Sequence, residues 1–155
     1  MTEVSSSAPD IAVYGPDNDL RLAVEVKAKP DASDEWATHF YRNILAHSRA
    51  PQARYFLLAL PRYFYLWRQR DGEAKPHLVY KADTPESLDQ YISSTGVAPS
   101  SSSGFAFEML VSTWLKGLAS SSLEDIEDQP GLKWTIDTGL YEAIKDGSVL
   151  SQPLE

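Results

Sequence analysis

Cysteine is absent from this chain of 155 residues. Its absence excludes disulfide bonds, metal sites built from thiolates, and catalysis by a cysteine nucleophile. The longest strongly apolar run, Tyr55 to Leu60, is far shorter than the roughly 20 residues that a membrane-spanning helix needs. The first residues, Met1 to Pro9, are polar and rich in serine, unlike a secretory signal. We therefore expect a cytoplasmic protein that has no membrane partner.

Several common catalytic motifs are also missing. The sequence contains no glycine-rich phosphate-binding loop, no G-x-S-x-G nucleophile motif and no H-E-x-x-H metal motif. A hydrophobic content of 43%, with 8 Tyr, 5 Phe and 4 Trp, is enough to form a globular core. The chain length suits one domain, or one domain with an appendage.

Positive charge is scarce overall, but it is concentrated in the middle of the chain. The net charge of −8 argues against general affinity for nucleic acid. Residues 1–20 carry a net charge of −4, residues 21–81 carry +5, and residues 82–155 carry −9. The middle segment is therefore the part that could face a phosphate backbone. The acidic C-terminal segment is explained equally well by a role in solubility.

Two short strands near the N-terminus are expected to form a β-hairpin. Ile11 to Tyr14 is apolar, and residues 20–28 alternate between apolar and polar side chains. Turn-forming residues lie between the two strands. A four-residue loop, Pro16 to Asp19, would place Gly15 opposite Leu20.

This register brings two acidic residues together. It pairs Ile11 with Val24, so that apolar side chains meet on one face, and it then sets Asp10 opposite Glu25. Lys27 points to the same side of its strand as Glu25. Directly opposed carboxylates destabilise a hairpin unless a cation lies between them. Two hard oxygen ligands and a nearby ammonium group are suited to Mg²⁺-assisted cleavage of a phosphodiester bond.

The remaining pattern predicts a mixed α/β sheet. Ser33 is expected to cap a helix from Asp34 to Arg49, with an apolar stripe formed by Trp36, Phe40, Ile44 and Leu45, and with Ala37 and Tyr41 beside it. Three further strands are expected: a central one at Tyr55–Leu60, one at Tyr63–Arg68 and one at His77–Lys81. Helices are expected at Pro85–Ile92, Phe105–Leu118 and Trp134–Asp146, the last interrupted at Gly139, with an acidic loop at Glu124–Asp128.

We divide the chain into a core at residues 1–92, a serine-rich linker at residues 93–104 and a helical C-terminal appendage at residues 105–155. The order β-β-α-β-β, followed by helices, indicates an α/β fold.

The motif Pro9-Asp10, followed by Glu25-Val26-Lys27, resembles the signature of the PD-(D/E)XK nuclease superfamily, which has the restriction-endonuclease-like fold. The resemblance covers roughly residues 9–68, and the chain looks like small stand-alone bacterial members of the superfamily. It implies a metal-dependent nuclease that acts on DNA. Asp10 and Glu25 would ligate Mg²⁺ or Mn²⁺, together with a backbone carbonyl near Val26. Lys27 would position the attacking water or stabilise the transition state.

The chain departs from the superfamily in one respect. Members usually have a helix before the first strand, and that helix often carries another acidic residue, but only nine residues precede Asp10 here. The helix that begins at Phe105, or a second subunit, would then cover that face of the sheet. The alternative to an enzyme is a catalytically inactive module on the same fold that binds nucleic acid or a partner protein.

Some side chains outside the motif have two readings. Arg42 and His39 are candidate phosphate contacts from the crossing helix, or else they form an exposed polar face. The four tryptophans are expected in the core or an interface rather than as stacking platforms. The run from Tyr63 to Trp67 is flanked by arginines, so it could bind single strands. We favour the other reading, an edge strand that pairs with another copy in a homodimer.

Overall fold

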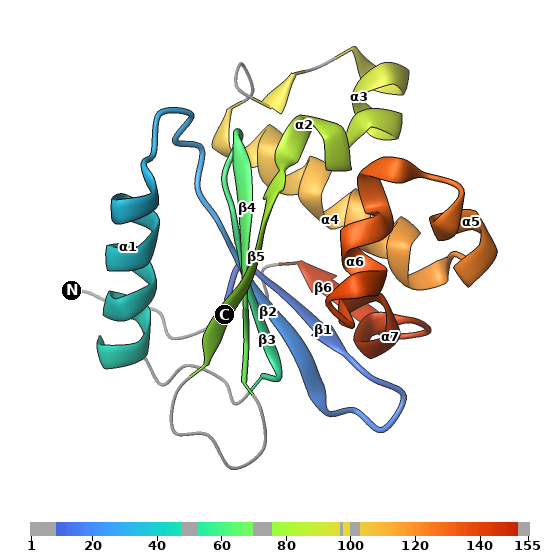
Figure 1. The fold of residues 1–155 in the computed structure, drawn as a ribbon, viewed down its shortest axis with the longest axis horizontal. Helices are drawn as coiled ribbons and strands as arrows, with labels where there is room; N and C mark the ends of the chain where they lie inside the picture. The colour runs from blue at the N-terminus through green and yellow to red at the C-terminus, as the bar shows by residue number, and fades with distance from the viewer. Residues whose placement is uncertain (1–8, 48–52, 70–75, 97, 100–102, 152–155) are drawn as a thin grey trace.

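The computed structural model describes residues 9–47, 53–69, 76–96, 98–99 and 103–151. In this part of the chain, six strands form one mixed sheet in the order β5-β4-β3-β2-β1-β6 (Figure 1). The strands are β1 (Ile11–Tyr14), β2 (Leu20–Val26), β3 (Tyr55–Ala59), β4 (Tyr63–Arg68), β5 (His77–Asp83) and β6 (Ser148–Ser151). Strands β2 and β3 are parallel, and every other neighbouring pair is antiparallel. The expected mixed α/β class is confirmed.

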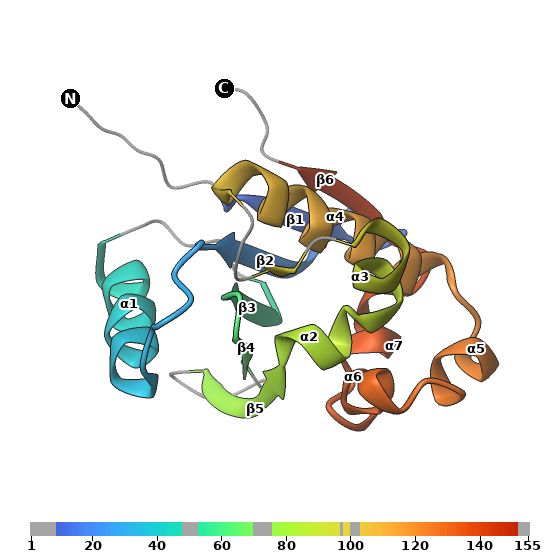
Figure 2. The same ribbon diagram turned by 90° about the horizontal axis from the view of Figure 1, so that it is seen from above.

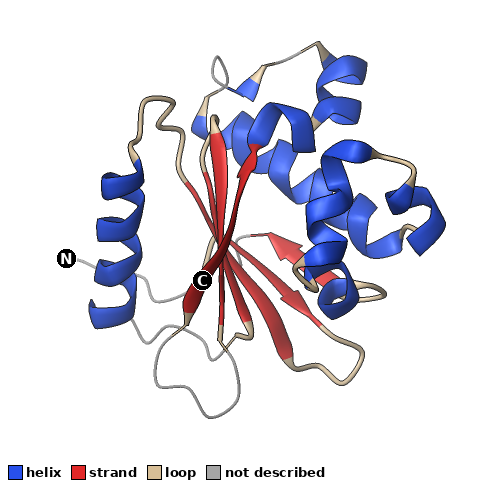
Figure 3. Cartoon of the chain, in the orientation of Figure 1, coloured by secondary structure: helices blue, strands red, loops and turns tan. Residues whose placement is uncertain are grey.

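Helices cover both faces of this sheet. Helix α1 (Asp34–His47) lies on one face, and the C-terminal helices lie on the other (Figure 2). The latter group contains α4 (Gly104–Ser120), α5 (Leu123–Glu127), α6 (Lys133–Asp137) and α7 (Leu140–Ile144), with a 3₁₀ turn at Pro130–Leu132. Two short helices, α2 (Thr84–Ser87) and α3 (Asp89–Thr95), connect β5 to α4 (Figure 3). None of the helices in the described ranges is long and apolar enough to cross a bilayer.

The hairpin of β1 and β2 forms with most of the expected register. Ile11 pairs with Val24 and Val13 pairs with Leu22, as the apolar pattern predicts. All four side chains are fully buried in the larger hydrophobic core, on the side of the sheet covered by the C-terminal helices. The burial of these apolar positions fixes the register, because a shift by one residue would move them to the opposite face, where the small side chains of Ala12 and Ala23 are packed.

The expected register is wrong at the turn. Tyr14, rather than Gly15, pairs with Leu20, because the ladder is irregular after Val13 and Arg21 is left as an extra residue. The side chain of Arg21 explains this bulge: its Nε donates to Asp19 Oδ2 over 2.7 Å, and its Nη1 donates to a backbone carbonyl of α7 over 2.9 Å.

Helix α1 carries the chain from β2 to the parallel strand β3. Ser33 caps it as predicted, since Ser33 Oγ accepts a hydrogen bond from the backbone N–H of Trp36 over 3.0 Å. Asp34 and Glu35 lie in its first turn, where the positive end of the helix dipole favours acidic side chains. The two residues beyond His47 that the prediction included lie outside the described residues.

The buried face of α1 is close to the predicted one but is rotated toward Ala37 and Tyr41. These two residues are buried, and the stripe residues Trp36, Phe40 and Ile44 are half-buried. The prediction is wrong for Leu45, which is 41% exposed. Tyr41 stacks on Trp67 of β4, with ring centroids 4.0 Å apart and planes 11° apart. The large aromatic side chains of this sheet face therefore set the rotation of the helix.

Strand β3 is buried and central, as predicted, but the prediction of β4 as an edge strand is wrong. Strand β4 pairs with β3 on one side and with β5 on the other. Strand β5 extends to Asp83, two residues beyond the predicted end, and so it pairs along the whole length of β4. Among the described strands, the edges of the sheet are β5 and β6.

The C-terminal segment shares its core with the sheet. Phe107, Val111 and Trp114 of α4 are buried in the same cluster as the strands of the hairpin. The described part of this segment ends in β6, a strand that the sequence pattern did not predict, and β6 pairs with β1. The expected interruption at Gly139 is confirmed, because that residue has a φ of 85° between α6 and α7.

Two predictions for the connecting segments are wrong. Helix α5 forms where an acidic loop was expected, because Ser122 Oγ accepts from the backbone N–H of Asp125 over 3.2 Å and Ile126 is buried. The first part of the predicted linker is helical, since α3 continues to Thr95 and ends at Gly96, which has a φ of 73°.

Candidate functional site

Asp10 lies directly before β1 and is joined to β2. Its Oδ2 accepts a hydrogen bond from the backbone N–H of Val26 over 2.8 Å. The next backbone N–H along, that of Lys27, bonds to Ala59 of β3 over 3.1 Å. The N–H of Val26 therefore faces the other way, toward β1, which begins only at Ile11. The carboxylate of Asp10 takes the place of the missing strand partner and is held against β2.

Glu25 is half-buried and lies in contact with this carboxylate. The pKa of Glu25 is raised to about 8, first by burial and then by the negative charge of Asp10 and a side-chain hydrogen bond between the two. The ammonium group of Lys27 lowers this pKa, and the carboxylate of Glu108 raises it. At neutral pH the Glu25 carboxyl group is therefore mainly protonated.

Lys27 comes directly after β2 and has an exposed side chain. Its charge acts on the carboxyl groups of both Glu25 and Glu108. Its Nζ also lies 5.5 Å from the ring centroid of Phe40 on α1. The structure therefore brings Asp10, Glu25 and Lys27 together at the end of β2, where a ligand can reach the lysine from solvent.

Glu108 is a member of this group that the sequence analysis missed. It lies in the first part of α4, and burial raises its pKa, with a further increase from Asp10 and an opposing effect from Lys27. Helix α4 approaches this end of the sheet, since a Cβ placed on Gly104 would lie 4.0 Å from the Cβ of Ala28. One signal was present in the sequence: Glu108 is the only charged residue from Gly104 to Leu115.

Helix α4 covers the hairpin on one face of the sheet. Its buried residues join those of β1 and β2 in one cluster. The same helix brings an acidic residue to the end of β2. The helix near Phe105 therefore covers this face of the sheet, one of the two expected alternatives, and adds an acidic residue near the end of β2.

The other predicted contacts, His39 and Arg42, lie on exposed positions of α1. The charges that shift the pKa of Glu25 come from Asp10, Lys27 and Glu108 instead. The residue of α1 that lies next to Lys27 is Phe40. Within the described ranges, no contact joins His39 or Arg42 directly to the carboxylate pair.

The donor atoms at this site suit a hard divalent cation. Mg²⁺ is commonly held by one or two carboxylates, with waters and substrate phosphate completing its shell. Asp10 and Glu25 supply two carboxylates, and the backbone of Val26, whose N–H bonds to Asp10, follows Glu25 in β2. Among the described residues, no group of three or more His, Asp or Glu side chains has an arrangement that could hold a metal ion. The protein ligands of a cation here would therefore be the two carboxylates and the backbone.

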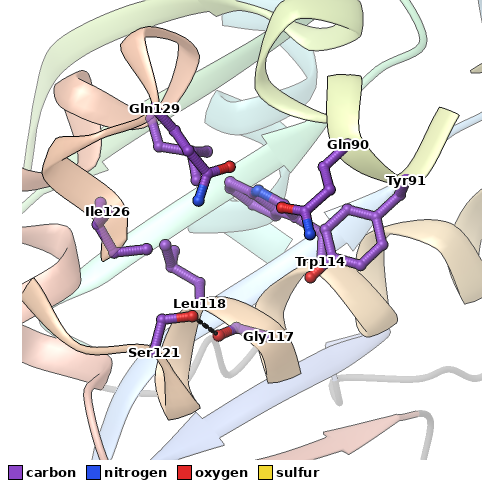
Figure 4. A pocket seen from close by; sticks show the side chains of 9 residues that line it. Gln90, Tyr91, Trp114, Gly117, Leu118, Ser121, Ile126 and Gln129 are labelled. Atoms are coloured by element: carbon purple, nitrogen blue, oxygen red, sulfur yellow. Dashed lines mark hydrogen bonds between the residues drawn. The ribbon is translucent and has the colours of Figure 1, made fainter. Parts of the chain in front are cut away.

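A small pocket lies elsewhere, among the helices (Figure 4). It encloses about 220 Å³ of space, part of which is open to solvent. Its lining residues are Gln90, Tyr91, Trp114, Gly117, Leu118, Ser121, Ile126, Gln129 and Leu132. The Nε1 of Trp114 is buried and has no hydrogen-bond partner within the described structure. None of the four acidic and basic residues at the end of β2 lines this pocket.

No family model, curated protein or solved structure matches this chain.

Proposed function

We propose that this chain is a divalent-metal-dependent nuclease of the restriction-endonuclease-like type that hydrolyses phosphodiester bonds in DNA. One observation carries the proposal: Asp10 and Glu25 form a half-buried, hydrogen-bonded carboxyl pair with Lys27 beside it. Burying two acidic groups together is costly. A cation that binds between them would relieve this cost, and a phosphodiesterase needs such a cation at the scissile phosphate.

Each of the three residues has a role that follows from its position. Asp10 is fixed by the N–H of Val26 and presents its remaining oxygen lone pairs as ligands. Glu25 supplies the second carboxylate once its proton has left. Lys27 projects into solvent, where its ammonium group can hold a phosphate oxygen and oppose the charge that grows in the transition state. A bound Mg²⁺ or Mn²⁺ would polarise the phosphate and acidify a water.

Glu108, on α4, lies near the group formed by Asp10, Glu25 and Lys27. Its raised pKa shows that it is partly removed from water near Asp10 and Lys27. With a divalent cation between Asp10 and Glu25, a third carboxylate gains a partner instead of adding repulsion. We assign it the task of holding water in the shell of the cation or of orienting Lys27.

Metal binding is the first test. Mg²⁺ and Mn²⁺ are titrated at pH 8 while the thermal midpoint of the wild-type protein and of Asp10→Ala is followed. We expect the cations to raise the midpoint of the wild type and to leave that of Asp10→Ala unchanged. Asp17→Asn is the matched control, because Asp17 is an exposed aspartate in the turn of the same hairpin. Equal responses of wild type and Asp10→Ala would contradict the site.

Cleavage is the second test. Linear, circular and single-stranded DNA are incubated with Mg²⁺ or Mn²⁺, and products are resolved by gel electrophoresis. We expect Glu25→Gln and Lys27→Met to lower the rate at least a hundredfold, in line with the loss of a group that stabilises transition-state charge. Lys116→Met, at an exposed position of α4, is the control for loss of one positive charge. An absence of cleavage with every substrate and cation would favour the alternative, an inactive module that binds nucleic acid or a partner protein.

A further inference from the structure

We propose that Trp36 and Phe40 of α1 form a stacking platform for an unpaired base next to the cleaved phosphate, so that the substrate is a single-stranded region of DNA. This inference rests on the proposed function, since it names the substrate class of the same site. It concerns residues that the sequence analysis placed in the core or an interface.

The two rings stack on each other. Trp36 and Phe40 lie one helical turn apart, with ring centroids 5.3 Å apart and planes inclined by only 13°. Both are half-buried: they pack against the smaller hydrophobic cluster, and part of each residue remains accessible to solvent. The positions of α1 that enter this cluster fully are Ala37 and Tyr41. The core between α1 and the sheet is therefore filled by other residues, and the two rings of the platform lie at the edge of this core.

Two ammonium groups connect the platform to the carboxylate site. Lys27 Nζ lies 5.5 Å from the ring centroid of Phe40, and Lys29 Nζ lies 5.6 Å from that of Trp36. Both lysines belong to the segment that runs from the end of β2 to the start of α1 (Figure 2). Lys27 is the lysine assigned to the scissile phosphate. A base attached to that phosphate would therefore be within reach of the rings.

The acidic side chains near the platform are partly paired with lysines. Asp31 and Asp34 each contact a lysine, whereas Glu35, in the first turn of α1, is exposed. Asp31 contacts Lys29 over 3.6 Å, and both partners are well exposed, so that a phosphate can compete for this lysine. Asp34 accepts from Lys81 Nζ over 2.8 Å and from the hydroxyl of Tyr65, and these contacts hold the pKa of the Asp34 carboxyl below its usual range.

The combination of rings and ammonium groups favours single strands. Aromatic side chains bind nucleic acid by stacking on the faces of bases, while lysines track the phosphates. In a duplex the faces of the bases are covered by their neighbours, and only the edges are accessible in the grooves. A platform next to the cleavage site can therefore be used only by a base that is unpaired.

Tryptophan fluorescence offers a direct readout. Trp67, Trp114 and Trp134 are 5%, 1% and 6% exposed, so that quenching by a stacked base reports on Trp36. The probe is a thymidine oligonucleotide of about 12 nucleotides, within the range of site sizes for such surfaces. It is titrated in EDTA, and again in Ca²⁺, with the duplex of the same length as the comparison. We expect the single strand to quench the fluorescence and the duplex to leave it unchanged.

Matched variants separate stacking from packing. Phe40→Leu removes the ring and keeps an apolar side chain, whereas Phe40→Tyr keeps the ring; Trp36→Leu and Trp36→Phe form the second pair. Binding of a labelled strand is measured by anisotropy. We expect the leucine variants to bind roughly tenfold more weakly, the loss typical of one base stack, and the aromatic variants to bind within about twofold of wild type. If a leucine variant does not fold, the wild-type quenching and the aromatic variants still test the platform.

The outcomes separate this inference from the proposed function. Equal binding of single strand and duplex, or equal affinities for the leucine and aromatic variants, would overturn the platform even if metal-dependent cleavage is observed. Selective, ring-dependent binding of single strands without any cleavage would support the platform and overturn the nuclease. Cleavage that favours single strands in wild type, and loses this preference in Phe40→Leu, is the result expected if both are correct.

Discussion

The carboxylate of Asp10 accepts a hydrogen bond from the backbone N–H of Val26 over 2.8 Å, and this bond completes the pairing of β2 on the side where β1 has not yet begun. Asp10→Ala would leave the N–H without its acceptor. We expect a loss of about 1–3 kcal/mol in the free energy of unfolding, the range for removing one partner of a charged hydrogen bond. Urea denaturation at pH 7 in EDTA measures it.

Asp10→Asn is the matched variant. Its amide oxygen can still accept from Val26, and the change removes the negative charge that raises the pKa of Glu25. We therefore expect Asp10→Asn to be clearly more stable than Asp10→Ala. If the two variants have equal stability, the hydrogen bond does not hold this end of the hairpin.

Glu25 should make the stability of the metal-free protein depend on pH. Its pKa is about 8 in the folded protein against a usual value of 4.5, so the folded state binds more protons between these two pH values. The stabilisation from this proton is fully present below pH 4.5 and is lost as the pH rises through 8. We expect the free energy of unfolding to fall across this window.

Glu25→Gln tests this dependence because it removes the titrating group and keeps the shape. At pH 7 we expect the variant to exceed the wild type in stability by an amount on the order of 3 kcal/mol, which corresponds to the pKa difference up to that pH. Urea denaturation at several pH values from 5 to 9, in EDTA, gives both curves. A wild-type curve parallel to that of Glu25→Gln would show that Glu25 has an ordinary pKa.

The same proton should compete with a divalent cation. Since Glu25 must be deprotonated to act as a ligand, metal binding should release close to one proton below pH 8. We expect the affinity for Mn²⁺ to increase by up to tenfold for each pH unit between 6 and 8, and to level off above. Calorimetric titrations in buffers of different ionisation enthalpy count the proton directly. An affinity that is constant over this range would separate Glu25 from the metal.

The hairpin and its carboxylate pair could be predicted because their determinants are local. The alternation of apolar residues in β2 and their pairing with β1 decide which side chains share a face, and they set Asp10 beside Glu25. The bulge at Arg21 could not be predicted in the same way. Its guanidinium bonds to the carbonyl of Ala143, which lies 122 residues away in sequence.

The position of Glu108 at the site also could not be predicted from local sequence. A lone acidic residue in an apolar helix was visible in the sequence, but its position depends on how α4 packs across the sheet. The rotation of α1 likewise follows from the stacking of Tyr41 on Trp67, a pair formed between elements that are distant in sequence. The alternation of apolar residues and the capping residues determine the helices and strands and the register of neighbouring strands. Packing between distant parts of the chain decides which side chains reach the site.

Gly139 separates α6 from α7, and here the structure leaves no room for a side chain. The residue has a φ of 85°, and a Cβ placed on it would lie 2.7 Å from the hydroxyl oxygen of Tyr55. That hydroxyl donates to the carbonyl of Thr138 over 2.7 Å. We expect Gly139→Ala to lose about 1–2 kcal/mol in the free energy of unfolding through the left-handed backbone alone, and more through displacement of Tyr55.

Gly96→Ala is the matched control, because Gly96 has a φ of 73° with nothing within 4 Å of an added Cβ. Thermal and urea denaturation of the two variants measure the difference, which isolates the close contact with Tyr55; equal losses would show that Tyr55 moves aside without cost.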